Sequence, residues 1–262
     1  MKALELYKAL TEKIPTSLSC EWDHDGPESC PDPDKKVSRV LVALDVHEGV
    51  IEKAASEGFD VIACHHPVFF GSLDGVSTTT VSGGRAVKLV RNGISVMSFH
   101  TRLDALDGGV NDTLAALVGL KNVTRVEADK DGIMRIGDVD GELTAKEFAV
   151  SVKDKLSCGE SGRERASVIL ADAGKRVKRV ALIGGSGGDY IYLAKEAGAD
   201  TYITGDIKHH QSFDSGCYGV NVLAAGHFFT EYPVCRVLAD KIREICPDAY
   251  VEVYFSNTTE TI

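Results

Sequence analysis

Residues Arg39–Pro67, with the sequence RVLVALDVHEGVIEKAASEGFDVIACHHP, carry the pattern that predicts the fold. It has the pattern of an apolar strand, a turn, an amphipathic helix, a Gly and an Asp, and then a second buried strand that Pro67 ends. Strand and helix signals alternate along most of the remaining chain, after a helix expected from about Lys2 to Glu12. This alternation predicts an α/β fold.

The chain also repeats itself. Residues 179–200, RVALIGGSGGDYIYLAKEAGAD, align without gaps on residues 39–60, and two short apolar segments that run into His100 and His227 form a further pair. The repeat predicts two similar α/β lobes from an internal duplication, with a cleft between them. We expect the first lobe at 1–122, a polar connecting segment at 123–176 and the second lobe at 177–262.

Composition excludes several classes of protein. The 262 residues are 44% hydrophobic, which suffices for a folded core, and the net charge of -10 argues against binding to duplex nucleic acid through its phosphates. The seven cysteines are widely spaced and form no CxxC pair, so they fit free thiols in a reducing cytosol. The N-terminus is too polar for a signal peptide, and no apolar stretch approaches a membrane span. We expect a cytoplasmic protein without a membrane partner.

Histidines mark the ends of three expected strands. His65 and His66 follow the first strand, His100 follows the second, and His227 follows the third. Adjacent imidazoles are costly in an apolar interior unless their nitrogens have hydrogen-bond partners or a metal. His100 and His227 are each followed four residues later by a carboxylate, Asp104 and Glu231, and on a helical turn that spacing places both groups on one face.

Imidazole and carboxylate together are the ligands that Zn²⁺, Fe²⁺, Mn²⁺ and similar ions prefer. Five or six such ligands exceed the needs of one tetrahedral zinc and suit two divalent metal ions bridged by a carboxylate and a water. The sequence therefore predicts a dinuclear metal centre, in which a metal-bound hydroxide would be the nucleophile at neutral pH.

The motifs HHP at 65–67, HTRLD at 100–104, GGVND at 108–112, GGSGGD at 184–189, ITGDIKHH at 203–210 and GHFFTE at 226–231 resemble, in this order, those of the NIF-three-like family. Members of that family are also called GTP cyclohydrolase I type 2 homologues. The resemblance covers about Trp22 to Tyr232. Two positions depart from the family pattern: His24 stands where Asn is usual, and Asp206 where Glu is usual.

The resemblance implies a dinuclear site whose ligands are His65, His66, Asp104, His227 and Glu231. It also implies two α/β lobes and a ring-shaped homohexamer. Because only about fifty residues separate the two halves, the chain resembles the short form of the family.

Other residues leave alternatives open. We assign catalytic, proton-moving roles to His100 and His210, with a structural position and an exposed helix surface as the respective alternatives. The loop Gly184–Gly188 fits tight strand–helix packing better than phosphate binding, and for Trp22 we favour packing over stacking on a base.

The principal hypothesis is a dinuclear metal-dependent hydrolase that acts on a small nucleotide-like molecule. The reaction would be ring opening of the GTP cyclohydrolase type or phosphoester hydrolysis. The alternative is a non-catalytic metal-binding protein with a regulatory or scaffold role, because the same ligands would serve it.

Overall fold

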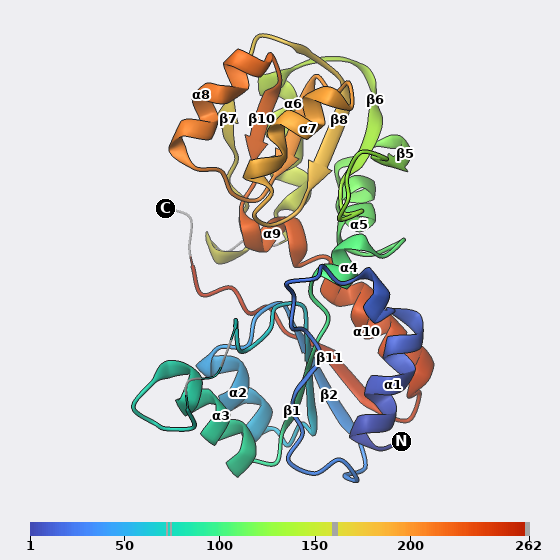
Figure 1. Ribbon diagram of the computed structural model, residues 1–262, viewed down its shortest axis with the longest axis vertical. Helices are drawn as coiled ribbons and strands as arrows, with labels where there is room; N and C mark the ends of the chain where they lie inside the picture. Colours follow the sequence, from blue (N-terminus) through green and yellow to red (C-terminus); the bar gives the residue numbers. More distant parts are fainter. Residues whose placement is uncertain (72, 74, 159–161, 260–262) are drawn as a thin grey trace. The chain divides into compact units, whose positions relative to one another are not determined.

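The apolar segments pair into two sheets, and the mixed α/β fold expected from the sequence is confirmed (Figure 1). The computed structural model describes residues 1–71, 73, 75–158 and 162–259. The chain divides into two units. The first contains Met1–Leu106 and Val234–Ser256, and the second contains Asp107–Pro233 and the residues from Asn257 onward.

The first unit is built on a five-stranded sheet with helices on its faces. The sheet has the order β1 (Pro27–Ser29), β4 (Ser95–Ser98), β3 (Val61–Cys64), β2 (Arg39–Ala43) and β11 (Tyr250–Val253). Only β1 pairs antiparallel among these described strands. The helices are α1 (Ala3–Lys13), α2 (Glu48–Ser56), α3 (Val81–Arg91), α4 (Thr101–Ala105) and α10 (Val234–Ile245), with a 3₁₀ turn at Thr16–Leu18. Helix α1 matches the expected N-terminal helix within one residue at each end.

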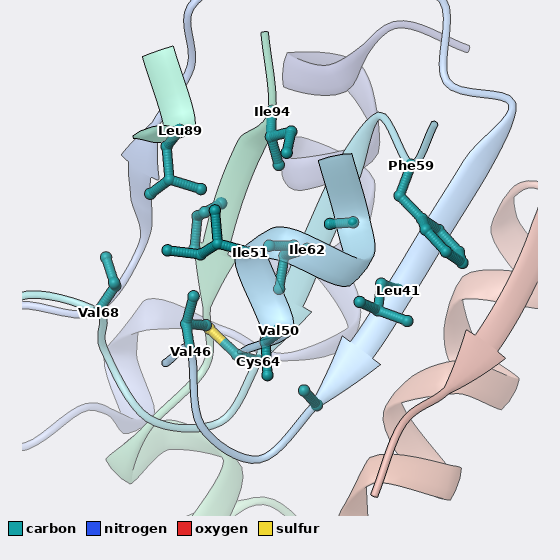
Figure 2. Close-up of a cluster of buried hydrophobic side chains, with 13 residues drawn as sticks. Leu41, Val46, Val50, Ile51, Phe59, Ile62, Cys64, Val68, Leu89 and Ile94 are labelled. Atoms are coloured by element: carbon teal, nitrogen blue, oxygen red, sulfur yellow. The ribbon is translucent and has the colours of Figure 1, made fainter. Parts of the chain in front are cut away.

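Alternating side chains of the strands set the core of this unit. Leu41 and Ile62 point to the face of the sheet that α2 covers with Val50 and Ile51, and all four side chains are at most 1% exposed (Figure 2). Strands β3 and β4 are buried on both faces because helices cover both, as parallel sheets require. This burial holds the carboxyl ends of β2, β3 and β4 rigidly at one edge.

The second unit is built on a six-stranded sheet. Its order is β5 (Lys121–Arg125), β6 (Arg135–Thr144), β8 (Arg176–Ile183), β9 (Thr201–Thr204), β10 (Asn221–Ala224) and β7 (Ile169–Ala171). The helices are α5 (Val110–Val118), α6 (Ala145–Leu156), α7 (Ile191–Glu196), α8 (His209–Tyr218) and α9 (His227–Glu231), with 3₁₀ turns at Gly162–Glu164 and Gly188–Tyr190. Strands β8, β9 and β10 run parallel, as β2, β3 and β4 do in the first unit.

The repeat seen in the sequence has a structural counterpart. Asp60 accepts hydrogen bonds from the backbone N–H groups of Ser38 and Arg39, at 2.8 and 3.0 Å. Asp200 accepts the equivalent bonds from Lys178 and Arg179, at 2.9 and 2.8 Å. In both units, therefore, an aspartate after the helix accepts hydrogen bonds from two successive backbone N–H groups, and these groups stand at aligned positions of the repeat.

The segment expected to connect two lobes is part of the second sheet. Strands β5, β6 and β7 and helix α6 all fall within residues 123–176 or overlap that range. The polar residues of β5 and β7 are explained by the place of these strands in the sheet. Both are edge strands, and both keep an exposed side.

The two compact units also divide the chain elsewhere than at the expected boundaries. Helix α10 and strand β11 lie within the expected second lobe, yet β11 pairs with β2 and both elements belong to the first unit. Strand pairing between residues two hundred positions apart leaves no local pattern in the sequence, so the boundary has no sequence signal here.

The Asp60 bonds predict a pH-dependent contribution to stability. Burial raises the pKa of Asp60, but hydrogen bonds from Ser38, Arg39 and Lys35 outweigh it and hold this pKa below its usual range. A lowered pKa in the folded state stabilises above about pH 4, and the contribution is lost as pH falls through the folded value. Asp60→Asn should therefore cost about 1–2 kcal/mol at pH 7 and progressively less below pH 4 in urea unfolding. A cost that does not change with pH would contradict this.

Candidate metal centre

Several polar side chains of the first unit lie at the carboxyl edge of its sheet. Ala43, Cys64 and Ser98 are aligned in neighbouring parallel strands, and the strands end there or at the next residue. Three groups therefore emerge side by side just beyond the strands: Asp45 after β2, the pair His65 and His66 after β3, and His100 after β4. This is the edge at which α/β proteins usually place their sites.

The three histidines form a close cluster. One ring nitrogen of each of His65, His66 and His100 lies within 4.8 Å of the other two. His65 is fully buried, and its Nε2 atom lies 3.6 Å from Oδ1 of Asp104 on α4. Of the five expected ligands, the first unit thus brings His65, His66 and Asp104 to one place, together with the expected catalytic residue His100.

Hydrogen bonds fix which ring nitrogen His65 and His66 each leave available to a metal. Nδ1 of His65 lies 3.0 Å from the backbone carbonyl oxygen of Phe99, which can only accept, so Nδ1 is the donor. Nδ1 of His66 lies 2.7 Å from Oδ1 of Asp45 and donates to it in the same way. In a neutral imidazole the lone pair is then on Nε2, and this is the arrangement found in histidines that bind metals.

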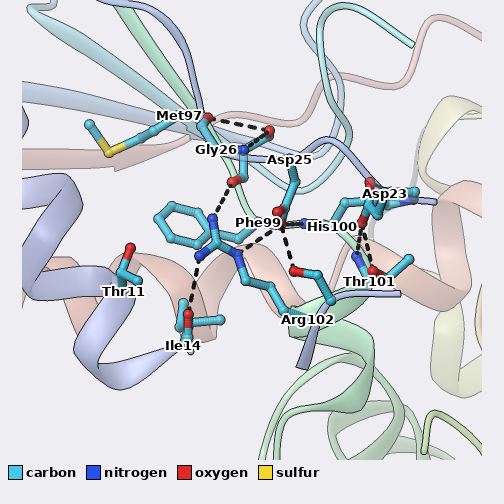
Figure 3. A network of polar contacts seen from close by, with 12 residues as sticks. Thr11, Ile14, Asp23, Asp25, Gly26, Met97, Phe99, His100, Thr101 and Arg102 are labelled. Carbon is cyan, nitrogen blue, oxygen red and sulfur yellow. Dashed lines mark hydrogen bonds and ion pairs between the residues drawn. The ribbon is translucent and has the colours of Figure 1, made fainter. Parts of the chain in front are cut away.

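The N-terminal loop holds His100. Asp23 accepts from Nδ1 of His100 at 3.1 Å and from the hydroxyl and backbone N–H of Thr101 at 2.6 and 3.0 Å (Figure 3). Burial raises the pKa of Asp23, but these bonds outweigh it and place the pKa far below its usual range. Asp23 is therefore a carboxylate at neutral pH, and it orients His100 with Nε2 directed away from the loop.

The second unit carries the other two expected ligands on one short helix. Helix α9 follows Gly226, the last residue of the loop after β10. It places His227 and Glu231 one turn apart, and Nε2 of His227 lies 3.0 Å from Oε2 of Glu231. Nδ1 of His227 lies 2.7 Å from Oδ2 of Asp206, which follows β9. The aspartate–histidine pairing of the first unit thus recurs here.

Two carboxylates make the surroundings of His227 suited to a cation. Burial lowers the pKa of His227, but the hydrogen bonds and negative charges of Asp206 and Glu231 outweigh it and raise the pKa to about 11. Glu231 itself is 4% exposed. Without a metal, a proton on Nε2 balances the charge; a divalent ion would replace that proton.

The glycine-rich loop after β8 packs against this helix. A Cβ atom on Gly185 would lie 2.0 Å from Oε1 of Glu231, and the backbone of Gly185 has φ +65°, a region that favours glycine. The backbone N–H of Gly185 donates to Oγ1 of Thr230 at 3.0 Å. Tight packing of the loop, as expected from the sequence, therefore lets Glu231 approach the backbone closely.

The residues present fit divalent metal ions. Each unit presents imidazole nitrogen beside carboxylate oxygen, which is the donor mixture for Zn²⁺, Fe²⁺ or Mn²⁺. Of the expected ligands, His65, His66 and His227 each hold their Nδ1 on an oxygen acceptor, which orients Nε2 toward a metal.

No described contact joins His210 to the candidate ligands of its own unit, His227 and Glu231. His210 is exposed in the first turn of α8. A cavity of about 260 Å³ lies in the same unit, lined by Ser186, Gly188, Asp189, Asp206, Ile207, Lys208 and Gln211. Two carboxylates in this lining disfavour an anionic ligand there.

Sequence reasoning missed three residues that orient the histidines. Asp23, Asp45 and Asp206 hold His100, His66 and His227. Asp45 and Asp206 each follow a buried strand within two residues, which is the same signal that identified His65 and His66. Asp23 stands in an irregular loop, and only its tertiary contact assigns it.

Comparison with known proteins agrees with the motifs. The family model for Duf34/NIF3 (NGG1p interacting factor 3) matches residues 1–261. The chain belongs to this family. The NIF-three-like resemblance inferred from the motifs is thereby confirmed.

Several relatives of this NIF3 family chain share its length. A GTP cyclohydrolase 1 type 2 homolog from Clostridium perfringens is 32% identical over 248 residues, which cover 93% of this chain and 92% of that protein. A homolog of the same name from Lactococcus lactis is 32% identical over 258 residues, covering 98% and 96%.

Solved structures share the fold. A hypothetical protein from Staphylococcus aureus has a TM-score of 0.87 at 28% identity, covering 100% of this chain and 99% of that one. Reduced HcgD from Methanocaldococcus jannaschii has a TM-score of 0.81 at 27% identity, covering 97% of each chain. Among the described residues, no helix is long and apolar enough to cross a membrane.

Proposed function

We propose that the chain is a dinuclear metal-dependent hydrolase, with His65, His66 and Asp104 of the first unit and His227 and Glu231 of the second as ligands of two divalent ions. The support is chemical: each unit holds an incomplete donor set, whereas together they offer three imidazoles and two carboxylates. Two such partial sets suit a pair of ions that both units hold.

One observation carries this proposal furthest. Each of the three histidine ligands donates from Nδ1 to an oxygen, and for His66 and His227 that oxygen belongs to an aspartate. A histidine on the protein surface has no need of a fixed oxygen acceptor at Nδ1. A metal-binding histidine does, because the partner selects the tautomer and raises the basicity of Nε2.

The substrate we propose is a small, nucleotide-like molecule, because relatives carry the name GTP cyclohydrolase 1 type 2 homolog. When bound, the ions would act as Lewis acids toward water and substrate. Within the chain, Asp23 holds Nδ1 of His100, so Nε2 of His100 is the atom placed to move a proton. Ring opening and phosphoester hydrolysis both need such a proton carrier.

Three further expectations from the sequence form part of the proposal. The equivalent bonds of Asp60 and Asp200 support an internal duplication of the two units. A homohexamer and a cytoplasmic location remain predictions. Light scattering of the purified protein and fractionation of cells would test these two.

The test is turnover by metal-reconstituted protein. Protein loaded separately with Zn²⁺, Mn²⁺ or Fe²⁺ would be incubated with GTP, other nucleotides and chromogenic phosphoesters. We expect metal-dependent turnover of at least one compound, its loss in His66→Ala, and a fall of about 10²–10⁴-fold in kcat for His100→Gln with metal retained. His210→Asn tests the other predicted proton carrier in the same assay.

His209→Asn serves as the control, because His209 is exposed on α8 and packs edge-on against Phe213 with ring centroids 5.0 Å apart. This variant should keep wild-type turnover. If no compound turns over while two metal equivalents remain bound, the hydrolase proposal fails. The non-catalytic metal-binding role would then be the better account.

A further inference from the structure

Two exposed aromatic side chains flank the histidine cluster of the first unit. Trp22 lies in the loop before β1 and is 64% exposed, and Phe70 follows β3 and is 69% exposed. The expectation that Trp22 packs into the protein is therefore wrong. Aromatic side chains of this size usually bury 150–250 Å², so two open rings beside a polar cluster need an explanation.

Both rings contact the same imidazole. The ring centroids of Trp22 and Phe70 each lie 5.9 Å from that of His100, with interplanar angles of 76° and 88°. Phe70 also lies 6.2 Å from the ring of His66. Edge-to-face contacts of this kind fix an aromatic ring while leaving most of its surface open to a ligand.

The position of these rings limits what they would bind. His100 and His66 are held by Asp23 and Asp45, so the rings stand against imidazoles that are themselves fixed. A planar ring that stacks on Trp22 or Phe70 would lie directly beside the metal ligands. Aromatic side chains bind every nucleobase by stacking, whereas a sugar phosphate without a base offers no aromatic face to stack on them.

We propose that Trp22 and Phe70 bind the planar, nitrogen-containing ring of the substrate by stacking, next to His66 and His100. The substrate class is then a heteroaromatic compound such as a purine nucleotide or a pterin. The inference relies on the proposed function for what happens to that ring, but binding of the ring does not require turnover.

The chain offers its own probe, because Trp22 is its single tryptophan. Titration of the full-length, metal-loaded protein with GMP, UMP or pterin should quench Trp22 fluorescence saturably, whereas ribose 5-phosphate should not. The same ligands would be measured by equilibrium dialysis, which needs no tryptophan. Trp22→Leu and Phe70→Leu should each weaken binding by about tenfold, and Trp22→Phe should keep most of it.

Phe213→Leu is a matched control, because Phe213 is 67% exposed in the second unit and should not affect binding. The inference is overturned if none of GMP, UMP and pterin binds at millimolar concentration, or if ribose 5-phosphate binds as well as GMP. It is also overturned if Trp22 emission shifts with protein concentration alone, since a second copy of the chain would then cover the rings. Ring binding together with no turnover of any compound in the substrate panel would contradict the proposed hydrolase and leave this inference standing.

Discussion

Glu231→Gln should lose metal, with affinity falling by on the order of 100-fold or more. Replacing a group that only orients a ligand already costs about 10–100-fold in affinity, and Glu231 is proposed as a ligand itself. The amide keeps the size of the side chain but removes its negative charge. Glu231 is buried, and its Oε2 lies 3.0 Å from Nε2 of His227, so the lost charge belongs to the immediate surroundings of this nitrogen. Elemental analysis and competition with a chromogenic chelator would measure the loss.

The matched control is Glu196→Gln, since Glu196 is an exposed glutamate on α7 of the same unit. It should bind metal as the unaltered protein does. Circular dichroism and urea unfolding would check that Glu231→Gln remains folded. If folded Glu231→Gln retains two equivalents with unchanged affinity, Glu231 is not a ligand, and the ligand set proposed for the second unit is wrong.

Arg102→Met should have the largest effect on stability, about 3–5 kcal/mol, which is typical when one member of a buried ion pair is removed. Arg102 is fully buried, and its Nε atom donates to Oδ2 of Asp25 at 2.7 Å. Its other nitrogens donate to the backbone carbonyls of Ile14 and Ser98, at 3.3 and 3.1 Å (Figure 3). Methionine keeps the apolar volume but leaves the Asp25 carboxylate without its cation.

Urea unfolding of Arg102→Met would measure this cost, with Arg91→Met, an exposed arginine at the end of α3, as the control. Adding Asp25→Asn should recover part of the loss, because the buried charge is then removed from both sides. Two results would show that the ion pair is not the source of the stability loss. One is a cost of Arg102→Met below about 1 kcal/mol. The other is a double variant whose loss of unfolding free energy exceeds the summed losses of the two single variants.

The positions of the proposed histidine ligands were predictable because each stands just after a strongly apolar strand. A short apolar run such as Val61–Cys64, soon followed by Pro67, favours a buried strand over a helix, and the carboxyl ends of neighbouring parallel strands meet at one sheet edge. His100 and His227 followed by the same argument. The argument does not extend to His210. Its place on a helix surface depends on how α8 packs, which a pair of adjacent histidines does not reveal.

The α/β class, the repeat, the family and the candidate ligands could all be predicted from the amino-acid sequence, because they depend on local periodicity and on spacing along the chain. The groups that orient the histidines follow only from the tertiary structure. Asp23 reaches His100 across 77 positions, and β11 joins β2 from the far end of the chain. Such contacts depend on packing and loop closure, which leave no regular spacing in the sequence. The open faces of Trp22 and Phe70 belong to the same class, because only the folded loops place these rings beside His100.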